Sequence, residues 1–390
     1  REHLGWPEEK FSIPSKALDH FRKAVVKGQK AEGTWNDLLT RYRQKYPDLA
    51  RQWDAMLKRD NGTDYKKHIP AFKPSDGPMA TRSASGKVLN SIAAALPQLV
   101  GGSADLTPSN NTYLKDYADF RKENGGRNLH FGVREHAMGA VLNGMALSKM
   151  LIPYGGTFLI FSDYMKPAIR LAALMEAHTI YVFTHDSVGL GEDGPTHQPI
   201  EQLTSLRAMP HITVIRPADA NETAMAWEIA LEHKHGPVAL ILTRQNLPII
   251  DRDKYAPARS IERGGYVLAD SAGLPEIILI ASGSEVALAL SAYEKLAADG
   301  INARLVNIAS FELFERQPES YRNEVLLPSV EKRLVIEAGA TLGWYKYAGL
   351  KGDVLGIDRF GASAPAKVIF EKLGFTVDNV IARAKALLNK

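Results

Sequence analysis

A glycine-rich loop at residues 184–202, THDSVGLGEDGPTHQPIEQ, carries five ionisable side chains within thirteen residues. It follows the apolar run 180–183, which is typical of a buried strand because it is rich in β-branched and aromatic residues. In open α/β sheets, ligands bind beyond the carboxyl ends of the strands, where this loop would lie. The ionisable residues are His185, Asp186, Glu192, Asp193 and His197. This pattern indicates chemistry on a bound ligand.

Two other interpretations of this loop remain open. Loops are polar by default, so two histidines on a solvated turn would be ordinary. Histidine and carboxylate side chains also bind metal ions. However, these side chains do not lie on one face of a predicted helix, and the glycines between them favour the approach of backbone to a bulky ligand over a compact coordination cage. The sequence therefore favours an organic ligand, and we predict no metal ligands.

Three other segments could take part in the same chemistry. Residues 101–110, GGSADLTPSN, could offer backbone and hydroxyl donors to an anion, although such segments are often only turns. Glu135 stands where an extended segment gives way to a helix, and the helix dipole alone would favour a carboxylate there. Phe158, Phe161 and Tyr164 recur every three residues. Aromatic residues at this spacing are usually core, unless a flat partner makes them a ring-binding pocket.

Length and composition limit the class of protein that positions these side chains. The chain has 390 residues, 45% hydrophobic and 24% charged, which is ordinary for a globular protein of two or three domains. Its formal charge of +4 is spread along the chain, which argues against nucleic-acid and membrane surfaces and favours small anionic substrates. The absence of cysteine excludes disulfides and thiol nucleophiles. No stretch has the apolar length of a membrane span, and we expect a cytoplasmic protein.

The chain divides into three predicted parts. Residues 1–74 show helical spacing at 17–26 and 35–46 and are expected to form a helical connector, with tryptophans that pack against a neighbouring domain. Residues 75–258 alternate helices with buried strands, and residues 259–390 continue as a smaller α/β domain, so we predict two consecutive parallel-sheet α/β domains. Strands are expected at 99–102, 180–183, 212–216, 238–242, 277–281, 303–308, 334–337 and 354–357. Helices are expected at 85–95, 136–150, 163–177, 220–233 and 285–298.

Five segments together resemble the second half of transketolase, a thiamine diphosphate enzyme. They are FGVREHAMG at 131–139, TFLIFSDY at 157–164, THDSVGLGEDGPTHQPIEQL at 184–203, TRQNLP at 243–248 and FGASAPA at 360–366. The resemblance runs along the whole chain, and the GLGEDGPTHQP string is highly specific. Deoxyxylulose-phosphate synthase and the β subunits of ketoacid dehydrogenases share the fold but lack this form of the loop. The resemblance implies a pyrimidine-binding domain followed by a transketolase C-terminal domain.

The resemblance also implies which residues bind thiamine diphosphate. Glu135 would hydrogen-bond the aminopyrimidine N1′ and drive that ring to its imino tautomer, which takes the proton from the thiazolium C2. Phe158, Phe161 and Tyr164 would surround the pyrimidine ring. The cofactor-binding positions on the neighbouring loop are Asp105 and Leu106.

On the substrate side, the resemblance implies phosphorylated sugars. Guanidinium forks suit phosphate oxygens. The positions that match the family's phosphate-binding residues are Arg82, Ser109, His185 and Arg244. Asp193 matches the residue that recognises a sugar hydroxyl beside the reacting carbon, and His197 lies near the sugar phosphate. The implied catalytic residues are Glu135, His185 and His197.

The sequence departs from the family in several places. His136 replaces an aromatic residue, and Ala362 stands where FGESAPA would have Glu. Transketolases bind Mg²⁺ or Ca²⁺ with a GDG motif on a separate N-terminal domain, and no GDG occurs here. We therefore expect that this diphosphate-binding domain is absent and that the cation comes only with it. Because the sequence opens on Arg1, we also expect the downstream part of a longer protein or one half of a split enzyme.

Three functions remain open. The chain could transfer a two-carbon ketol unit from a ketose phosphate to an aldose phosphate when a diphosphate-binding domain or subunit is supplied, and be inactive alone. It could be a dimerising fragment without turnover. It could also be a related thiamine-dependent synthase, such as dihydroxyacetone synthase. In each case we expect a homo-oligomer, at least a dimer, because the family's cofactor lies between two subunits.

Overall fold

The computed structural model describes residues 2–7, 9–58, 62 and 64–389 and divides the chain into two units, residues 1–60 and 61–390. The first unit is helical and contains η1 (Glu2–Leu4), α1 (Ser15–Lys45) and α2 (Pro47–Leu57). The helices expected at 17–26 and 35–46 thus form one continuous helix. Pro47 begins α2, where the N–H that proline lacks would have no partner within the helix.

The tryptophans of the first unit were expected to pack against a neighbouring domain. Trp6 and Trp35 are 43% and 50% exposed, so neither is buried within the chain. Their packing role therefore stays a prediction.

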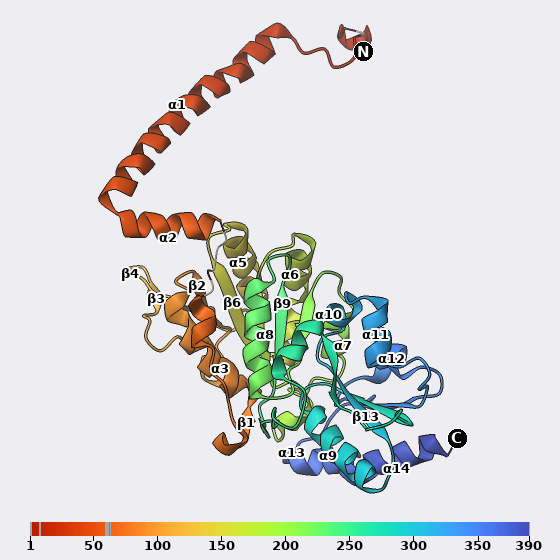
Figure 1. Cartoon of the computed structure of the whole chain (residues 1–390). Coiled ribbons are helices and arrows are strands. Elements are labelled where there is room, and N and C mark those ends of the chain that lie inside the picture. The colour runs from red at the N-terminus through yellow and green to blue at the C-terminus, as the bar shows by residue number, and fades with distance from the viewer. Residues whose placement is uncertain (1, 8, 59–61, 63, 390) are drawn as a thin grey trace. The chain divides into compact units, whose positions relative to one another are not determined.

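The second unit contains a six-stranded parallel sheet (Figure 1). Its strands, in spatial order, are β5 (Asn128–His130), β2 (Leu99–Ser103), β6 (Ile152–Phe158), β7 (Ile180–Thr184), β9 (Val238–Leu242) and β8 (Thr213–Ile215). Two short antiparallel pairs lie outside it: β1 (Met79–Ala80) with β10 (Asn246–Leu247), and β3 (Phe120–Arg121) with β4 (Asn124–Gly125). All neighbouring strands of the large sheet are parallel, as predicted.

Helices cover both faces of this sheet. One face is covered by α3 (Thr81–Ile92) and α8 (Ala220–Glu232), and the other by α5 (Glu135–Leu147), α6 (Ser162–Leu174) and α7 (Gln202–Arg207). The alternation of side chains along a strand explains the two cores. Ile180 and Val182 of β7 belong to the core with α3 and α8, whereas Tyr181 and Phe183 belong to the core with α5 and α6.

A second sheet of five strands follows in the chain. Its spatial order is β11 (Gly265–Ala269), β13 (Ala303–Ile308), β12 (Ile277–Ala281), β14 (Arg333–Ile336) and β15 (Asp353–Leu355). Only β11 is antiparallel to its neighbour. One face packs on α9 (Glu285–Ala298) and α14 (Val377–Leu388), and the other on α10 (Phe311–Glu315), α11 (Glu319–Val325) and α12 (Tyr345–Ala348). One apolar cluster continues through both sheets.

Short helices connect these elements. They are η2 (Asp64–His68), η3 (Pro74–Asp76), η4 (Ala93–Ala95), α4 (Thr107–Asn110), η5 (Leu159–Phe161), η6 (Val188–Leu190), η7 (Ala258–Arg263), η8 (Thr341–Trp344) and α13 (Ala366–Lys372).

The α/β class with parallel sheets is confirmed, but the sequence did not reveal β5, β6 or β11. Strand β6 reads IPYGGTF, which lacks an apolar run. Its glycines are needed because neighbouring elements approach closely: a Cβ on Gly155 would lie 2.5 Å from Leu142 Cδ1, and one on Gly156 would lie 2.8 Å from Thr112 Cγ2. The domain limits at residues 75–258 and 259–390 stay a prediction.

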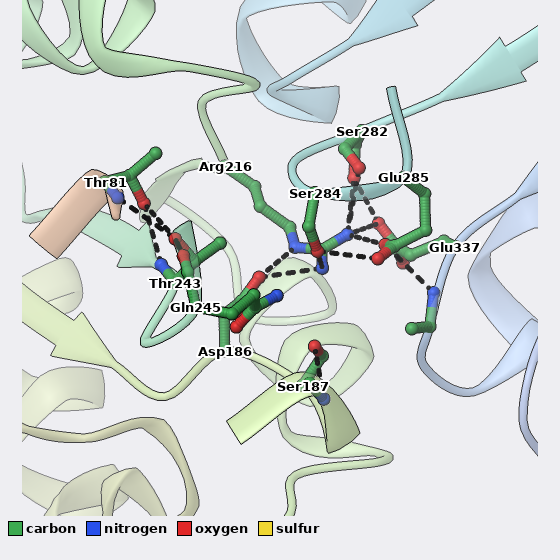
Figure 2. Close-up of polar contacts among 12 residues, drawn as sticks. Thr81, Asp186, Ser187, Arg216, Thr243, Gln245, Ser282, Ser284, Glu285 and Glu337 are labelled. Carbon is green, nitrogen blue, oxygen red and sulfur yellow. Dashed lines mark hydrogen bonds and ion pairs between the residues drawn. The ribbon is translucent and has the colours of Figure 1, made fainter. Parts of the chain in front are cut away.

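A fully buried ion cluster joins the two sheets (Figure 2). Arg216, which follows β8, donates to Asp186 Oδ2 from Nε at 3.0 Å and from Nη2 at 2.7 Å. On the side of the second sheet, its Nη1 donates to Glu285 and lies 3.5 Å from Glu337. Glu337 also accepts two hydrogen bonds from Arg207, at 2.8 and 3.0 Å. The cluster therefore ties the loop after β7 to the second sheet.

Glu285 and Glu337 contact the same guanidinium, yet their pKa values shift in opposite directions. Burial raises the pKa of Glu285, and Arg216 does not cancel this effect. Burial would also raise the pKa of Glu337, but the charges of Arg207 and Arg216 outweigh it and lower that pKa to about 2. Because this folded-state pKa lies below the ordinary value of 4.5, the stability from Glu337 is present above pH 4.5 and is lost as the pH falls toward 2.

Replacing Arg216 by methionine should lower the free energy of unfolding by roughly 3–5 kcal/mol, because the substitution leaves buried carboxylates without their counter-charge. Arg259→Met is the matched control. Arg259 also binds a glutamate, Glu228, but its side chain is 57% exposed, so its loss should cost under about 1 kcal/mol. Urea unfolding of both variants measures the difference. Equal losses would show that the buried cluster contributes no special stability.

Candidate active site

The predicted site residues come together at the carboxyl edge of the first sheet. Phe158 ends β6 and lies opposite Thr184 at the end of β7, which in turn lies opposite Leu242 at the end of β9. Because these strands are parallel, the loops that follow them share one edge. The ends of β2 and β5 lie at the same edge. The loops that follow β2, β5, β6, β7 and β9, with the helices that they open, carry Asp105, Leu106, Ser109, Glu135, Phe161, Tyr164, His185, Asp193, His197 and Arg244.

Five ring side chains form a continuous cluster at this edge. Phe158 stacks on Phe161 with centroids 5.7 Å apart, and Phe161 stacks on Tyr164 at 6.0 Å. His185 lies against Phe158 at 3.7 Å, and His197 meets Phe161 edge-on at 5.5 Å. Exposure rises along the cluster from 7% at Phe158 to 66% at Tyr164. The cluster therefore offers a flat apolar wall with imidazole groups beside it.

Two arginines lie near these histidines. Arg82, in the first turn of α3, donates from Nη1 to the carbonyl oxygen of Ser109 at 2.8 Å. Reciprocal hydrogen bonds between Thr81 and Thr243 hold the start of α3 against the end of β9, which precedes Arg244 (Figure 2). Burial and the charge of Arg244 lower the pKa of Arg82. Two neighbouring guanidinium groups of this kind suit an anion with several oxygens.

His185 is held in an unusual state. It is buried, and its backbone has a φ of +63°, in the left-handed region that non-glycine residues seldom adopt. Burial lowers the pKa of His185 to about 3, and the positive charges of Arg82, Arg244 and His197 add to this effect. The imidazole is therefore neutral at physiological pH. Strained backbone of this kind persists where the surrounding structure determines it, often at functional sites.

The second sheet supplies a clamp for the loop that carries Asp193 and His197. Gln198 Nε2 donates to the carbonyl oxygens of Gly191 at 3.0 Å and of Ala362 at 2.9 Å. Ser363 Oγ donates to the carbonyl oxygen of Glu192 at 2.5 Å. The FGASAPA segment thus holds the loop through the Ala362 carbonyl and the Ser363 hydroxyl, while Asp193 stays exposed. The sequence motifs did not indicate that Gln198 or Ser363 would be part of the site.

Glu135 is the first residue of α5 and is buried at the helix start. Backbone N–H groups at a helix N-terminus favour a carboxylate there.

Among the described residues, no group of three or more His, Asp or Glu side chains is arranged to hold a metal ion. No described helix is both long enough and apolar enough to span a membrane.

Comparisons with known proteins identify the family. The family model "Transketolase, pyrimidine binding domain" matches residues 77–249, "Transketolase-like TK C-terminal domain" matches 264–376, and "Transketolase, thiamine diphosphate binding domain" matches 1–61. The chain is 54% identical over 381 residues to transketolase from Aquifex aeolicus, covering 97% of this chain and 55% of that protein. It is 47% identical over 392 residues to chloroplastic transketolase from Craterostigma plantagineum, covering 100% of this chain and 75% of that protein.

Solved structures agree with the sequence comparisons. Transketolase from Leishmania mexicana superimposes with a TM-score of 0.92 at 39% identity, covering 98% of this chain and 56% of that one. A structure described as "Split gene transketolase, inactive beta4 tetramer" is more distant, with a TM-score of 0.64 and 25% identity. The match covers 80% of this chain and 99% of that one.

The fold and the site define an α/β enzyme module of the thiamine diphosphate class. The chain belongs to the transketolase family. It spans about half the length of several of the relatives that it matches. The expected absence of the N-terminal diphosphate-binding domain was wrong for residues 1–61, which match the model of that domain. The segment gave no sign of this domain because it has no GDG motif and shows only charged helical spacing.

The pyrimidine end of thiamine diphosphate fits the residues at this edge. The stacked rings of Phe158, Phe161 and Tyr164 offer the flat apolar surface that an aromatic ring requires. Glu135 offers a buried carboxylate as a hydrogen-bonding group.

Arg82 has an unused hydrogen-bond donor. Its Nε is buried without a hydrogen-bond partner in the part of the chain that the structure describes, so this guanidinium can donate a further hydrogen bond to a ligand.

His185 should stay neutral from about pH 8 to about pH 5 in the folded chain, because its pKa is lowered to about 3. A ¹⁵N-labelled sample would show ring signals that do not shift over this range, whereas in urea the same ring should titrate near 6.5. Since the folded-state pKa is depressed, stability from neutral His185 is present above pH 6.5 and is lost as the pH falls toward 3. Titration near 6.5 in the folded chain would contradict this description.

Proposed function

We propose that this chain supplies the pyrimidine-binding and sugar-phosphate-binding part of a transketolase. The reaction is the reversible transfer of a two-carbon ketol unit from a ketose phosphate to an aldose phosphate. The donors would be xylulose 5-phosphate or sedoheptulose 7-phosphate, and the acceptors ribose 5-phosphate or glyceraldehyde 3-phosphate. The observation that carries this proposal is that the ring cluster of Phe158, Phe161, Tyr164, His185 and His197 lies at the same sheet edge as Arg82 and Arg244.

Thiamine diphosphate, when bound, supplies the nucleophilic carbon that accepts the ketol unit. The proposed role of Glu135 is to share a proton with N1′ of the pyrimidine ring. The three stacked aromatic residues would pack on that ring and exclude water. Asp105 and Leu106, which follow β2 at the same edge, would also contact the cofactor.

On the substrate side, Arg82, Arg244 and Ser109 would bind the sugar phosphate by charge-assisted hydrogen bonds. An imidazole with a pKa of about 3 is too weak a base to remove a proton at neutral pH, so His185 would position the sugar by hydrogen bonding. We assign proton transfer to His197, which is less deeply buried. Asp193 would recognise the hydroxyl beside the reacting carbon.

We also propose a homodimer as the minimal assembly. Apolar side chains remain exposed on α5, on α6 and beside them, and an uncovered apolar face of this kind marks a protein interface. They are Val133, Val141, Leu147, Tyr164, Leu171, Leu174 and Met175. Mg²⁺ or Ca²⁺ would accompany the cofactor's diphosphate only when a diphosphate-binding half is supplied, with oxygen ligands from that half. The cytoplasmic location stays a prediction.

A second candidate function is an assembly without turnover. The match to the split-gene transketolase structure covers 99% of that chain, and the structure is described as an inactive β4 tetramer. By that likeness, the present chain would fold and self-associate but need a diphosphate-binding chain for activity. A thiamine-dependent synthase such as dihydroxyacetone synthase would use the same residues with another acceptor.

The deciding assay measures ketol transfer from xylulose 5-phosphate to ribose 5-phosphate. It is run on the chain alone and after addition of the N-terminal half of the Aquifex aeolicus relative. Activity only in the mixture would support the catalytic proposal, and activity of the chain alone would show that no added half is needed. A lack of transfer in both would favour the inactive assembly. Formaldehyde as the acceptor tests the synthase.

In the active preparation, Glu135→Gln should lower kcat by roughly 100-fold or more, because it removes a proton-sharing group while keeping the size of the side chain. Glu123→Gln is the control, since Glu123 lies exposed on the β3–β4 hairpin. Circular dichroism checks that both variants fold. Activity of Glu135→Gln within a few-fold of the parent would remove Glu135 from the mechanism.

Arg244→Ala should raise KM for phosphorylated sugars far more than for an unphosphorylated hydroxyketone, because only the phosphate makes the charge-assisted pair. The expected rise for the phosphorylated substrate is roughly tenfold or more, the factor that corresponds to about 1.4 kcal/mol. Lys122→Ala removes an exposed charge elsewhere and serves as the control. An equal rise for both substrate classes would indicate a structural role for Arg244.

A further inference from the structure

A chain of buried hydrogen bonds lies behind His185. Thr184 Oγ1 is 2.8 Å from His185 Nδ1, and Asn110 Nδ2 donates to Thr184 Oγ1 at 2.7 Å. Ser103 Oγ donates to Asn110 Oδ1 at 2.7 Å and accepts the backbone N–H of Leu106 at 3.1 Å. The side chains of Ser103, Asn110 and Thr184 are fully buried. Together they connect the loop after β2 to the imidazole at the end of β7.

The backbone N–H of Leu106 sets the direction of this chain. A backbone N–H can only donate, so Ser103 Oγ accepts there and keeps its own proton for Asn110 Oδ1. The amide of Asn110 then presents its NH₂ group to Thr184. If His185 Nδ1 carried a proton, Thr184 Oγ1 would accept twice, and its own proton would have no acceptor among the hydrogen bonds of the described residues. The Thr184 hydroxyl therefore donates to Nδ1, which is the unprotonated ring nitrogen.

The opposite direction leaves a buried donor unused. If Asn110 turned its NH₂ group toward Ser103, the Ser103 oxygen would accept twice, and its proton would have no acceptor among the hydrogen bonds of the described residues. An unsatisfied buried donor costs free energy, so this arrangement is disfavoured. The contacts thus select one tautomer of His185.

We propose that Ser103, Asn110 and Thr184 are positioning residues that hold His185 as the tautomer with its proton on Nε2. This inference rests on the proposed function, because it specifies how His185 meets the sugar phosphate. The stacking of the imidazole on Phe158 at 3.7 Å fixes the plane of the ring, and the hydrogen bond to Thr184 fixes its rotation. Both constraints act before any substrate binds.

The tautomer determines which substrate atom His185 recognises. With Nδ1 engaged by Thr184, the remaining polar atom of the ring is the Nε2–H donor, which requires an oxygen acceptor on the substrate. Arg82 and Arg244 are also obligatory donors. The three side chains together present only donors, which matches a hydroxyl, carbonyl or phosphate oxygen and excludes a ligand that offers hydrogen-bond donors alone.

Long-range ¹H–¹⁵N correlation of the ¹⁵N-histidine-labelled full chain tests the proposal directly. The resonances of His185 are assigned by their loss in His185→Gln. The expected spectrum has a pyridine-type resonance at Nδ1 and a pyrrole-type resonance at Nε2. The reverse pattern, or an equal mixture of the two, overturns the proposal. This readout needs no turnover, so it is separate from any failure of the transketolase assay.

Three variants test the hydrogen-bond chain itself. Thr184→Ser keeps the hydroxyl and should retain the spectrum, whereas Thr184→Val removes it and should yield a mixture of tautomers. Asn110→Asp replaces the NH₂ donor with an acceptor, so the Thr184 hydroxyl should turn to the new carboxylate and the proton of His185 should move to Nδ1. Thr157→Val is the control, because the Thr157 hydroxyl is buried in β6 without a hydrogen-bond partner among the described residues. An unchanged His185 spectrum in Thr184→Val would overturn the relay.

Discussion

The salt bridge between Arg216 and Asp186 is the interaction on which the arrangement of the site depends. Asp186 directly follows His185, so the guanidinium holds the backbone at the point where β7 becomes the active-site loop. On its other side, Arg216 binds Glu285 at the start of α9 and lies near Glu337, which follows β14 of the second sheet. Burying these charges is costly, and the hydrogen bonds that Arg216 donates to Asp186 and Glu285 offset part of that cost. The position of the loop after β7 therefore depends on both sheets.

The electrostatics of the site complement this buried cluster. The acidic groups Asp186, Glu285 and Glu337 are engaged in the interior, whereas Arg82 and Arg244 lie at the sheet edge. Neither arginine forms an ion pair with a carboxylate of the described residues, so an anion that enters the edge meets their positive charge. Because the same positive charge and burial keep His185 neutral, the site combines charge attraction with a directional hydrogen bond. In the proposed function, phosphate binding and sugar orientation would then be separate tasks of neighbouring residues.

The sequence predicted best those features that depend on local pattern. Apolar runs such as 180–183 and 238–242 identified buried strands, and the loop that follows the first run carried its own chemical signature. β6 escaped prediction because its glycines are explained by close contacts with residues distant in the chain, such as Leu142 and Thr112.

Residues with long-range partners were also beyond sequence reasoning. Arg216 reads as the polar end of a strand, and its partners lie 30 or more residues away in the chain. Asn110 and Thr184, separated by 74 residues, show no joint signal. The match of residues 1–61 to a diphosphate-binding domain was likewise hidden, because helical spacing without a GDG motif does not distinguish a connector from part of a domain.

The clamp formed by Gln198, Ala362 and Ser363 has a consequence for engineering and for evolution. The contacts run between the active-site loop and backbone or hydroxyl groups of the FGASAPA segment, so the two segments must match in shape more than in side-chain chemistry. At position 362 the contact uses only the backbone carbonyl, so alanine supplies it without a functional side chain. The clamp also means that the second sheet cannot be exchanged between homologues as an independent module. A chimaera should take its junction before the loop at residue 184, so that loop and clamp come from one parent.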